Sequence, residues 1–393
     1  VLENGAQSPY VDWFYTDEAF LRGDRPLLAY PEAADWHAKQ SGGSGGGIAS
    51  TLETTLGYKA WWQLPALPKI NVGNPEAREH LLQAAEHWIR FGADGWRLDV
   101  PEEIDDESFW QEFRARVRAI NPEAYTVGEI WKRADAWLSG DRFDATMNYP
   151  LTEAILGFVG SGRLARDLGD HNETHKRPEL DAEQFSERLI EIMGWYHPAT
   201  TAVQLNLLGS HDTPRLRSIL GGSAAAARLA MLLQLALPGA PCIYYGDELG
   251  ALGANDPANR GPFPADLTAV DADAASFRSF VRGAVAARHA HPVLRSGALR
   301  VVHASGPVLL FERSADPHGF EGSTLQLPPG AARRLWIAAN TGAAAARVRL
   351  ELGQARAVTR LDWDGVTATA TLEGGGELTV ELPPVSGAIF RVD

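Results

Sequence analysis

The sequence contains a single cysteine, Cys242, among its 393 residues. One cysteine forms no internal disulfide, which favours a reducing compartment such as the cytoplasm, although a secreted protein without disulfides is also consistent. The sequence also lacks any apolar run of about 18 residues or more, so no membrane-spanning helix is expected. No cluster of histidines and cysteines has the spacing of metal ligands, so we expect no catalytic metal.

Basic residues are scarce relative to acidic ones. The chain has 36 Lys and Arg against 50 Asp and Glu, which gives a net charge of −14. Nucleic acids and anionic membranes require a basic surface, so neither is expected as a partner. A neutral substrate such as a sugar is compatible with this charge. A hydrophobic fraction of 45% is typical of a soluble protein with a sizeable core, and the length predicts two or three domains.

The first part of the chain, to about residue 60, shows no sustained hydrophobic period. Its run Ser41-Gly42-Gly43-Ser44-Gly45-Gly46-Gly47 is typical of a flexible loop, and we favour a native surface loop over an engineered linker. From residue 74 onward, helix and strand signals alternate. Asn74-Pro75-Glu76 predicts a helix start, and further helices are expected at 106–120, 223–237 and 275–290. The strand candidates are 95–100, 125–130, 143–148, 203–209 and 241–245.

This alternation predicts a parallel sheet with helical crossovers, and both a barrel and an open doubly wound sheet fit the pattern. After about residue 298 the helical signals stop. The segments 347–352, 377–382 and 389–392 alternate polar and apolar residues, with glycine clusters between them. This part of the chain is therefore predicted to be an antiparallel β domain.

Three carboxylates, Asp99, Glu129 and Asp212, each lie at the carboxyl end of a predicted parallel strand. In a β/α barrel the loops that follow the strands converge there and form the active site. Retaining glycoside hydrolysis needs one carboxylate as nucleophile and another as acid and then base, roughly 5–5.5 Å apart. Arg97 precedes Asp99 by two residues, so both side chains point to the same side of the strand. The arginine would keep Asp99 ionised, as a nucleophile requires; an ordinary structural ion pair is the alternative.

The residues around these carboxylates resemble signature regions of the α-amylase superfamily, glycoside hydrolase family 13. The segments that carry this resemblance are Gly95-Trp96-Arg97-Leu98-Asp99, Gly128-Glu129-Ile130-Trp131 and Ser210-His211-Asp212. Two further segments resemble the neopullulanase, cyclomaltodextrinase and maltogenic amylase branch: Leu67-Pro68-Lys69-Ile70-Asn71, and Ile243-Tyr244-Tyr245-Gly246-Asp247-Glu248 followed by Asn255-Asp256-Pro257 and Arg260. The resemblance covers essentially the whole chain.

The resemblance implies an α/β fold: a (β/α)8 TIM-type barrel with a C-terminal antiparallel β-sandwich. It implies that Asp99 is the nucleophile, Glu129 the acid/base and Asp212 the residue that binds sugar hydroxyls in the transition state. Substrate-binding roles are implied for two further pairs, Arg97 with His211 in the cleavage subsite and Asp256 with Arg260 at the next glucose.

The resemblance implies no required cofactor and allows a structural calcium ion. Trp131 either lines the cleft or belongs to the core. Trp61 and Trp62 are interpreted as packing residues.

The sequence departs from the family in two places. The first family signature, an Asp followed by an Asn-His pair after the third barrel strand, is absent. We therefore expect residues 1–60 to be the remnant of the excursion domain inserted after strand three, residues 61–297 to supply barrel strands four to eight, and residues 298–393 to form the β domain. The first three βα units would then be missing, and the segment alone is expected to be weakly active or inactive. Pro101-Glu102 also differs from the Ala-Asn common in this branch, near the leaving-group side.

The predicted function is hydrolysis of α-1,4 glucosidic bonds in maltodextrins, cyclodextrins or pullulan through a covalent glycosyl-enzyme intermediate, with α-1,6 bonds left open. Two alternatives stay open. One is a transglycosylase acting on sucrose, trehalose or maltose, and the other is a catalytically inactive carbohydrate-binding homologue. The expected partner is an α-glucan, with a homo-oligomer or a complementary N-terminal chain also left open. The predicted location is the cytoplasm.

Overall fold

The computed structural model describes residues 4–24, 57–61, 64, 66–168, 178–315, 325–352, 357–373 and 376–393. The Gly/Ser run at 41–47 and Trp62 lie outside these residues. The chain divides into two compact units. The first comprises Val1–Thr126 with Ser139–Phe143, and the second comprises Val127–Leu138 with Asp144–Asp393. The domain boundaries expected at 60 and 297 stay predictions.

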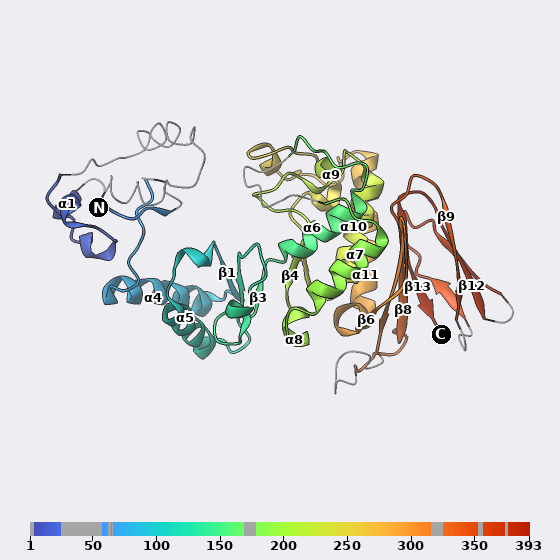
Figure 1. The fold of residues 1–393 in the computed structure, drawn as a ribbon, viewed down its shortest axis with the longest axis horizontal. Helices are drawn as coiled ribbons and strands as arrows, with labels where there is room; N and C mark the ends of the chain where they lie inside the picture. Colours follow the sequence, from blue (N-terminus) through green and yellow to red (C-terminus); the bar gives the residue numbers. More distant parts are fainter. Residues whose placement is uncertain are drawn as a thin grey trace. The chain divides into compact units, whose positions relative to one another are not determined.

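The first unit contains the helix–strand pattern expected after residue 74 (Figure 1). Asn74 caps helix α4, and its Oδ1 accepts hydrogen bonds from the backbone N–H groups of Glu76 and Ala77, both at 3.0 Å. The elements of this unit are η1 (Gly5–Gln7), η2 (Val11–Trp13), α1 (Glu18–Leu21), α4 (Pro75–Phe91), β1 (Gly95–Leu98), η4 (Pro101–Glu103), α5 (Glu107–Ile120) and the start of β2 (Tyr125–Gly128).

Strand β1 and the start of β2 approach each other closely. Tyr125 N donates a hydrogen bond to Asp94 O at 3.1 Å, and a Cβ added to Gly95 would lie 1.9 Å from Tyr125 O. Only glycine fits at this point of the strand. The glycine at the start of the motif is thus explained by backbone packing.

The second unit continues the parallel strands. The end of β2 pairs in parallel with β3, a bridge from Met147 to Leu205 joins β3 to β4, and β4 pairs in parallel with β5. The helices and strands of this part are η5 (Asp135–Leu138), β3 (Ala145–Thr146), α6 (Tyr149–Val159), α7 (Ala182–Met193), α8 (Pro198–Thr201), β4 (Leu205–Leu207), α9 (Leu216–Ile219), α10 (Ala224–Ala236), β5 (Ala240–Cys242), η7 (Asp247–Leu249), η8 (Ala258–Arg260), α11 (Ala272–Ala290) and α12 (Val293–Ser296). All five strands predicted between residues 95 and 245 are therefore present, each shorter than its sequence signal.

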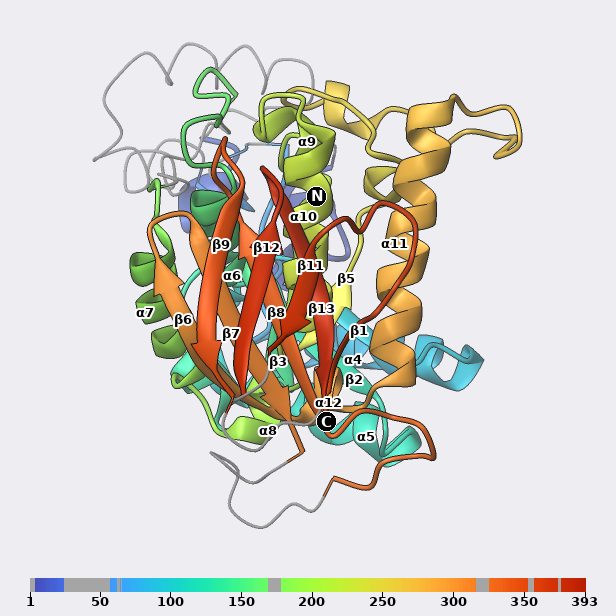
Figure 2. The ribbon, with the colours of Figure 1, turned by 90° about the vertical axis from the view of Figure 1, so that its right-hand side faces the viewer.

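The C-terminal part of the second unit consists of two antiparallel sheets. One has the strand order β10-β13-β8-β7-β6 and the other has the order β11-β12-β9. Figure 2 shows β9, β12 and β11 stacked in front of the larger sheet, with α6 and α10 behind it. The strands are β6 (Ala298–Ser305), β7 (Val308–Ser314), β8 (Arg334–Asn340), β9 (Ala346–Glu351), β10 (Val358–Arg360), β11 (Thr369–Leu372), β12 (Glu377–Leu382) and β13 (Ser386–Val392). The predicted antiparallel β domain is confirmed.

One hydrophobic core joins the helices of the second unit to the larger sheet, and two buried arginines lie within this region. Arg313 of β7 donates hydrogen bonds to the carbonyls of Ala236 and Leu294, and Arg288 of α11 donates to Leu235 at 2.7 Å and Leu237 at 3.1 Å. Burial lowers the pKa of Arg313 to about 9 and that of Arg288 to about 10. The two cations bind the carbonyls at the end of α10, where the helix dipole is negative.

Candidate active site

The first unit holds the predicted nucleophile beside its predicted arginine. Arg97 lies in β1, and Asp99 follows directly after the strand ends at Leu98. Arg97 Nη1 donates a hydrogen bond to Asp99 Oδ1, and the two side chains are 30% and 64% exposed. The predicted pairing of these two residues is present. The carboxylate is thus oriented by a cation and open to solvent on the surface of this unit.

The backbone turns sharply immediately after Asp99. Val100 has φ 34° and ψ 58°, which is the left-handed region. A β-branched residue in this conformation costs roughly 1–2 kcal/mol, because Cβ crowds the following carbonyl oxygen. Strain of this kind persists only where surrounding structure imposes it, and it is concentrated at functional sites. The strained residue directly adjoins the predicted nucleophile.

The segment that marks the branch contacts the loop after Asp99. Lys69 Nζ forms an ion pair with Glu103 Oε2 at 2.8 Å, with both side chains about one-third exposed. Glu103 ends the short helix η4, which begins at Pro101. Pro101 is buried and Glu102 is exposed, so one residue of the unusual Pro101-Glu102 pair anchors the loop and the other faces solvent.

The second unit brings four predicted residues into one cluster around Asp212. His211 Nε2 lies 3.1 Å from Asp212 Oδ2, and Arg260 Nη2 lies 3.4 Å from Asp212 Oδ1. Arg260 Nε also lies 2.9 Å from Asp256 Oδ1. The four side chains are between 35% and 54% exposed, so they remain accessible to a ligand. Sequence reasoning assigned all four to substrate binding or catalysis, and the structure places them in contact.

Glu129 and Trp131 follow β2 in the same unit. Glu129 is buried, with 3% of its surface exposed. The ring of Trp131 stacks on Tyr149, with centroids 3.5 Å apart and an interplanar angle of 5°. Trp131 is therefore at least partly a packing residue. A cleft-lining role for its edge stays a prediction.

A chain of contacts connects Trp131 to the turn that carries Asp212. Tyr149 Oη donates a hydrogen bond to Ser210 Oγ at 3.3 Å, and Asp212 N donates to the same oxygen at 3.2 Å. The loops after β2 and β4 are thus joined by a stacked ring and a shared hydroxyl. Asp99 belongs to the first unit and Glu129 to the second, so their separation of roughly 5–5.5 Å stays a prediction.

Two buried charged residues near the Asp212 turn had no role predicted from the sequence. Arg215 Nη1 lies 3.5 Å from Asp247 Oδ1, and the two side chains are only 3% and 1% exposed. The Arg215 guanidinium also lies over the rings of Tyr244 and Tyr245, at 4.5 and 4.7 Å. Burial raises the pKa of Asp247 to about 7, and the nearby Arg215 charge opposes that rise. Asp247 lies in the segment Ile243–Glu248 whose residues resemble the branch, but the sequence assigned no role to it or to Arg215.

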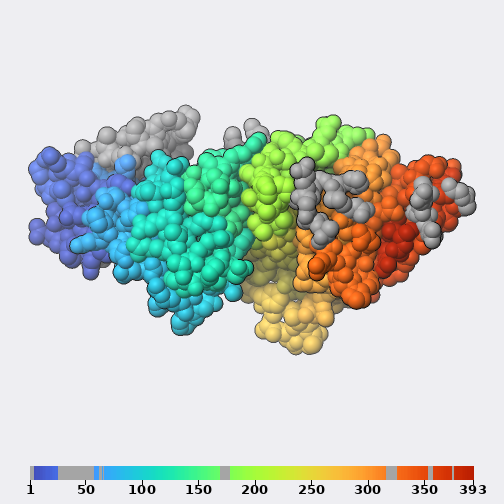
Figure 3. All heavy atoms as spheres, turned by 90° about the horizontal axis from the view of Figure 1, so that it is seen from below, coloured from blue at the N-terminus to red at the C-terminus, as the bar shows by residue number. Residues whose placement is uncertain are grey.

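A cavity of about 400 Å³ adjoins Arg215 on the second unit. Its lining includes Arg217, Tyr245, Leu252 and Asp273, and the ion pair between Arg217 and Asp273 has a length of 2.6 Å. In Figure 3 the gold-coloured residues before and at the start of α11 stand out from the surface of this unit. The loop that follows β5 supplies residues to both sites: Tyr245 and Leu252 line the cavity, and Asp256 and Arg260 belong to the Asp212 cluster.

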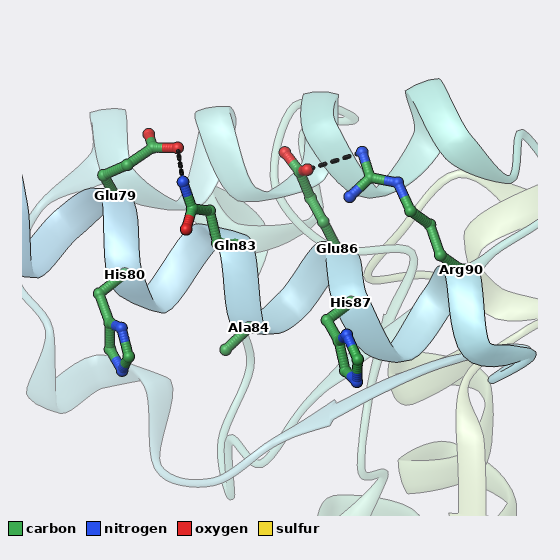
Figure 4. A pocket seen from close by; sticks show the side chains of 7 residues that line it. All are labelled: Glu79, His80, Gln83, Ala84, Glu86, His87 and Arg90. Atoms are coloured by element: carbon green, nitrogen blue, oxygen red, sulfur yellow. Dashed lines mark hydrogen bonds and ion pairs between the residues drawn. The ribbon is translucent and has the colours of Figure 1, made fainter.

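A larger hollow, of about 540 Å³, runs along the surface of α4 in the first unit. Figure 4 shows Glu79, Gln83, Glu86 and Arg90 along one side of the helix, and His80 and His87 along the other. Gln83 donates to Glu79 at 2.9 Å, and Arg90 pairs with Glu86 at 2.8 Å. None of the predicted site residues lines this hollow. We therefore assign it no part in the site.

Within the described ranges, no group of three or more His, Cys, Asp or Glu side chains could hold a metal ion. Within the same residues, every helix is too short or too polar to cross a membrane.

A model of the alpha-amylase catalytic domain matches residues 3–286 of the sequence. The chain belongs to the alpha-amylase family. It is 40% identical over 261 residues to a cyclomaltodextrinase of Geobacillus thermopakistaniensis and 38% identical over 262 residues to neopullulanase 2 of Thermoactinomyces vulgaris. These matches cover 66% and 67% of this chain but 37% of each relative.

A similar solved structure extends this result to the fold. The debranching enzyme of Nostoc punctiforme superposes with a TM-score of 0.77 at 35% identity, covering 100% of this chain and 71% of that one. The predicted family, its neopullulanase and cyclomaltodextrinase branch, and the barrel fold with a C-terminal β domain are confirmed. The chain spans little more than a third of the length of the two curated relatives, so the activity of the whole protein is treated below as a proposal.

Proposed function

We propose that this chain carries the catalytic residues of a retaining glycoside hydrolase that cleaves α-glucosidic bonds in maltodextrins, cyclodextrins or pullulan. The observation that supports this most strongly is the cluster of His211, Asp212, Asp256 and Arg260, which combines charged donors and acceptors on an exposed face. A sugar hydroxyl can donate a hydrogen bond to a carboxylate and accept one from a guanidinium group. Relatives named cyclomaltodextrinase and neopullulanase support this substrate class.

In the proposed mechanism Asp99 attacks the anomeric carbon and forms a covalent glycosyl intermediate, while Glu129 protonates the leaving oxygen. Glu129 then deprotonates a water that hydrolyses the intermediate. Arg97 holds the Asp99 carboxylate in place through its hydrogen bond. The burial of Glu129 suits a group that must carry a proton in one step and release it in the next.

The roles of the other residues follow from charge. Asp212 accepts hydrogen bonds from sugar hydroxyls as positive charge develops on the ring, and His211 donates to the same sugar. Arg260 pairs with Asp212 at 3.4 Å and with Asp256 at 2.9 Å, so it holds both carboxylates in one orientation before the substrate arrives. This preorganisation lowers the cost of fixing the substrate.

The test compares Asp99→Asn and Glu129→Gln with the exposed control substitutions Asp105→Asn and Glu123→Gln. Each site variant should lower kcat on soluble starch or cyclodextrin by several orders of magnitude, whereas the controls should leave it unchanged. NMR of the first product should show the α-anomer. Near-normal turnover in either site variant would refute its role.

The assay should use both this chain and the product of the whole gene. Transfer to an added acceptor sugar, in place of hydrolysis, would favour the transglycosylase alternative. Binding of α-glucan without turnover would favour the inactive homologue.

Three further expectations belong to this proposal. The chemistry requires no cofactor, and a structural calcium ion would show as a lower Tm after treatment with a chelator. Oligomeric state is testable by light scattering. A cytoplasmic location is supported by the single cysteine.

A further inference from the structure

Asn259 lies between the two residues proposed to contact the second glucose, Asp256 and Arg260, but its own side chain faces inward. It belongs to the short helix η8 and is fully buried, with 0% of its surface exposed. Its Nδ2 donates hydrogen bonds to His211 O at 2.7 Å and to Thr213 O at 2.8 Å. These two carbonyls lie on either side of Asp212. We propose that Asn259 is the positioning residue that sets the backbone turn carrying Asp212.

The chemistry of the two partners fixes the orientation of the amide. Both are carbonyl oxygens, which only accept hydrogen bonds, so the amide nitrogen with its two hydrogens must face them. An amide nitrogen supplies one hydrogen to each carbonyl. An aspartate at this position would instead bring a carboxylate against two carbonyl oxygens, and an alanine would leave both oxygens buried without this donor.

The other end of the Asn259 amide supports a positioning role. Asn259 Oδ1 is buried and has no hydrogen-bond partner in the described part of the chain. A buried acceptor without a partner costs about 1–3 kcal/mol, so such groups are rare in native structures. The unpartnered Oδ1 therefore costs stability, while Nδ2 of the same side chain binds the Asp212 turn.

The loop that carries Asn259 forms two further hydrogen bonds with the Asp212 turn. Arg215 N donates a hydrogen bond to Gly253 O at 3.0 Å, and Arg260 Nε donates to His211 O at 3.0 Å. Two side chains donate to His211 O: Arg260, which is 45% exposed, and Asn259, which is buried. Of these two hydrogen bonds, the one from Asn259 is shielded from competition with water. In the described part of the chain, the ion-pair partners of the Asp212 side chain, His211 and Arg260, are both partly exposed. Its position therefore depends on the backbone that Asn259 fixes.

The chain offers a matched control in Asn340. This residue is also fully buried, and its Nδ2 donates to the carbonyls of Ala344, Leu382 and Pro383 at 2.9–3.3 Å. Asn340 lies in β8 of the C-terminal sandwich and contacts none of the proposed site residues. Replacing either asparagine removes a buried donor from more than one carbonyl. A purely structural role for Asn259 would make the two substitutions equivalent.

The experiment compares Asn259→Ser, Asn259→Ala, Asn340→Ser and Asn340→Ala in the full protein, measuring kcat, KM and Tm on cyclodextrin. All four should lower Tm. Only the Asn259 variants should lower kcat, and Asn259→Ala should lower it more than Asn259→Ser. The expected loss for Asn259→Ala is about 10²-fold, because a small misplacement of a catalytic group has an effect of that size. Amide hydrogen exchange of residues 209–215 should accelerate in the same two variants. If Asn259→Ala fails to fold, the serine variant, which keeps one donor, carries the test.

The inference rests on the proposed function of Asp212, so Asp212→Asn is measured beside these variants. An inactive Asp212→Asn together with normal kcat and unchanged hydrogen exchange in the Asn259 variants would overturn the positioning role alone. Near-normal turnover of Asp212→Asn would overturn the proposed function of that residue. Equal loss of kcat in the Asn340 variants would show that general destabilisation explains the result and would also overturn the inference.

Discussion

The buried carboxyl of Asp247 should make the stability of the fold depend on pH. Burial raises its pKa from 3.8 to about 7. The folded state therefore holds this proton more tightly than the unfolded state. The resulting stabilisation is complete below about pH 4 and is lost as the pH rises to about 7. Each pH unit within that window corresponds to about 1.4 kcal/mol, so the whole effect has an upper value of about 4 kcal/mol.

The substitution Asp247→Asn isolates this effect, because asparagine has nearly the same shape and does not titrate. The free energy of unfolding of the wild type, minus that of the variant, should fall steadily from about pH 4 to about pH 7 and then level off. Urea unfolding at half-unit pH intervals measures both proteins under the same conditions. Subtraction removes the contribution of groups that titrate equally in the two.

The control is Asp266→Asn, the same chemical change at an exposed carboxyl. Hydrogen bonds from Thr268 lower the pKa of Asp266, so both its folded and its unfolded forms titrate at the acid edge of the window or below it. Its difference curve should therefore be flat from about pH 5 upward. A curve for Asp247→Asn that is also flat above about pH 5 would refute the reasoning, because it would mean that Arg215 keeps the folded carboxyl ionised across the window.

Two other predictions concern the backbone near the proposed nucleophile. Gly95→Ala should lower the free energy of unfolding by about 1–3 kcal/mol or more, because the new methyl group would collide with Tyr125 O; an unchanged urea midpoint would contradict this. Val100→Gly should be close to neutral, because relief of roughly 1–2 kcal/mol of strain offsets the entropy cost of glycine. The matched change Val127→Gly, at a buried position of β2, should be clearly destabilising in the same assay, and equal losses would argue against strain at Val100.

The strands and the major helices could be predicted because their signals are local. The helix start at Asn74 is one example: a capping side chain followed by proline is visible in three residues. The strand at 95–100 was predicted too long, since it ends at Leu98. The left-handed turn at Val100 ends the strand. This turn could not be predicted from the sequence, because valine rarely adopts a positive φ.

Within the site, residues of one short motif could be predicted to meet, as Arg97 and Asp99 do. The ion pair from Arg260 to Asp212 joins residues 48 positions apart and required the fold. Asn259 was missed for a different reason. Its partners are backbone carbonyls, and a carbonyl has no sequence signature by which a partner could be inferred. The buried ion pair of Arg215 and Asp247 could not be predicted for another reason: it joins residues from two separate loops, and only the fold brings them together.

The two arginines at the end of α10 bear on how this protein could be rearranged by recombination or engineering. Arg313 comes from the β-sandwich and Arg288 from the helix before it, yet both bind carbonyls around the same helix end. A graft of another sandwich onto these helices would leave Ala236 and Gly297 without their donor unless the new strand carried an arginine at the corresponding position. The sandwich is therefore not an interchangeable module, because a replacement must carry an arginine on the strand equivalent to β7 in order to bind the end of α10.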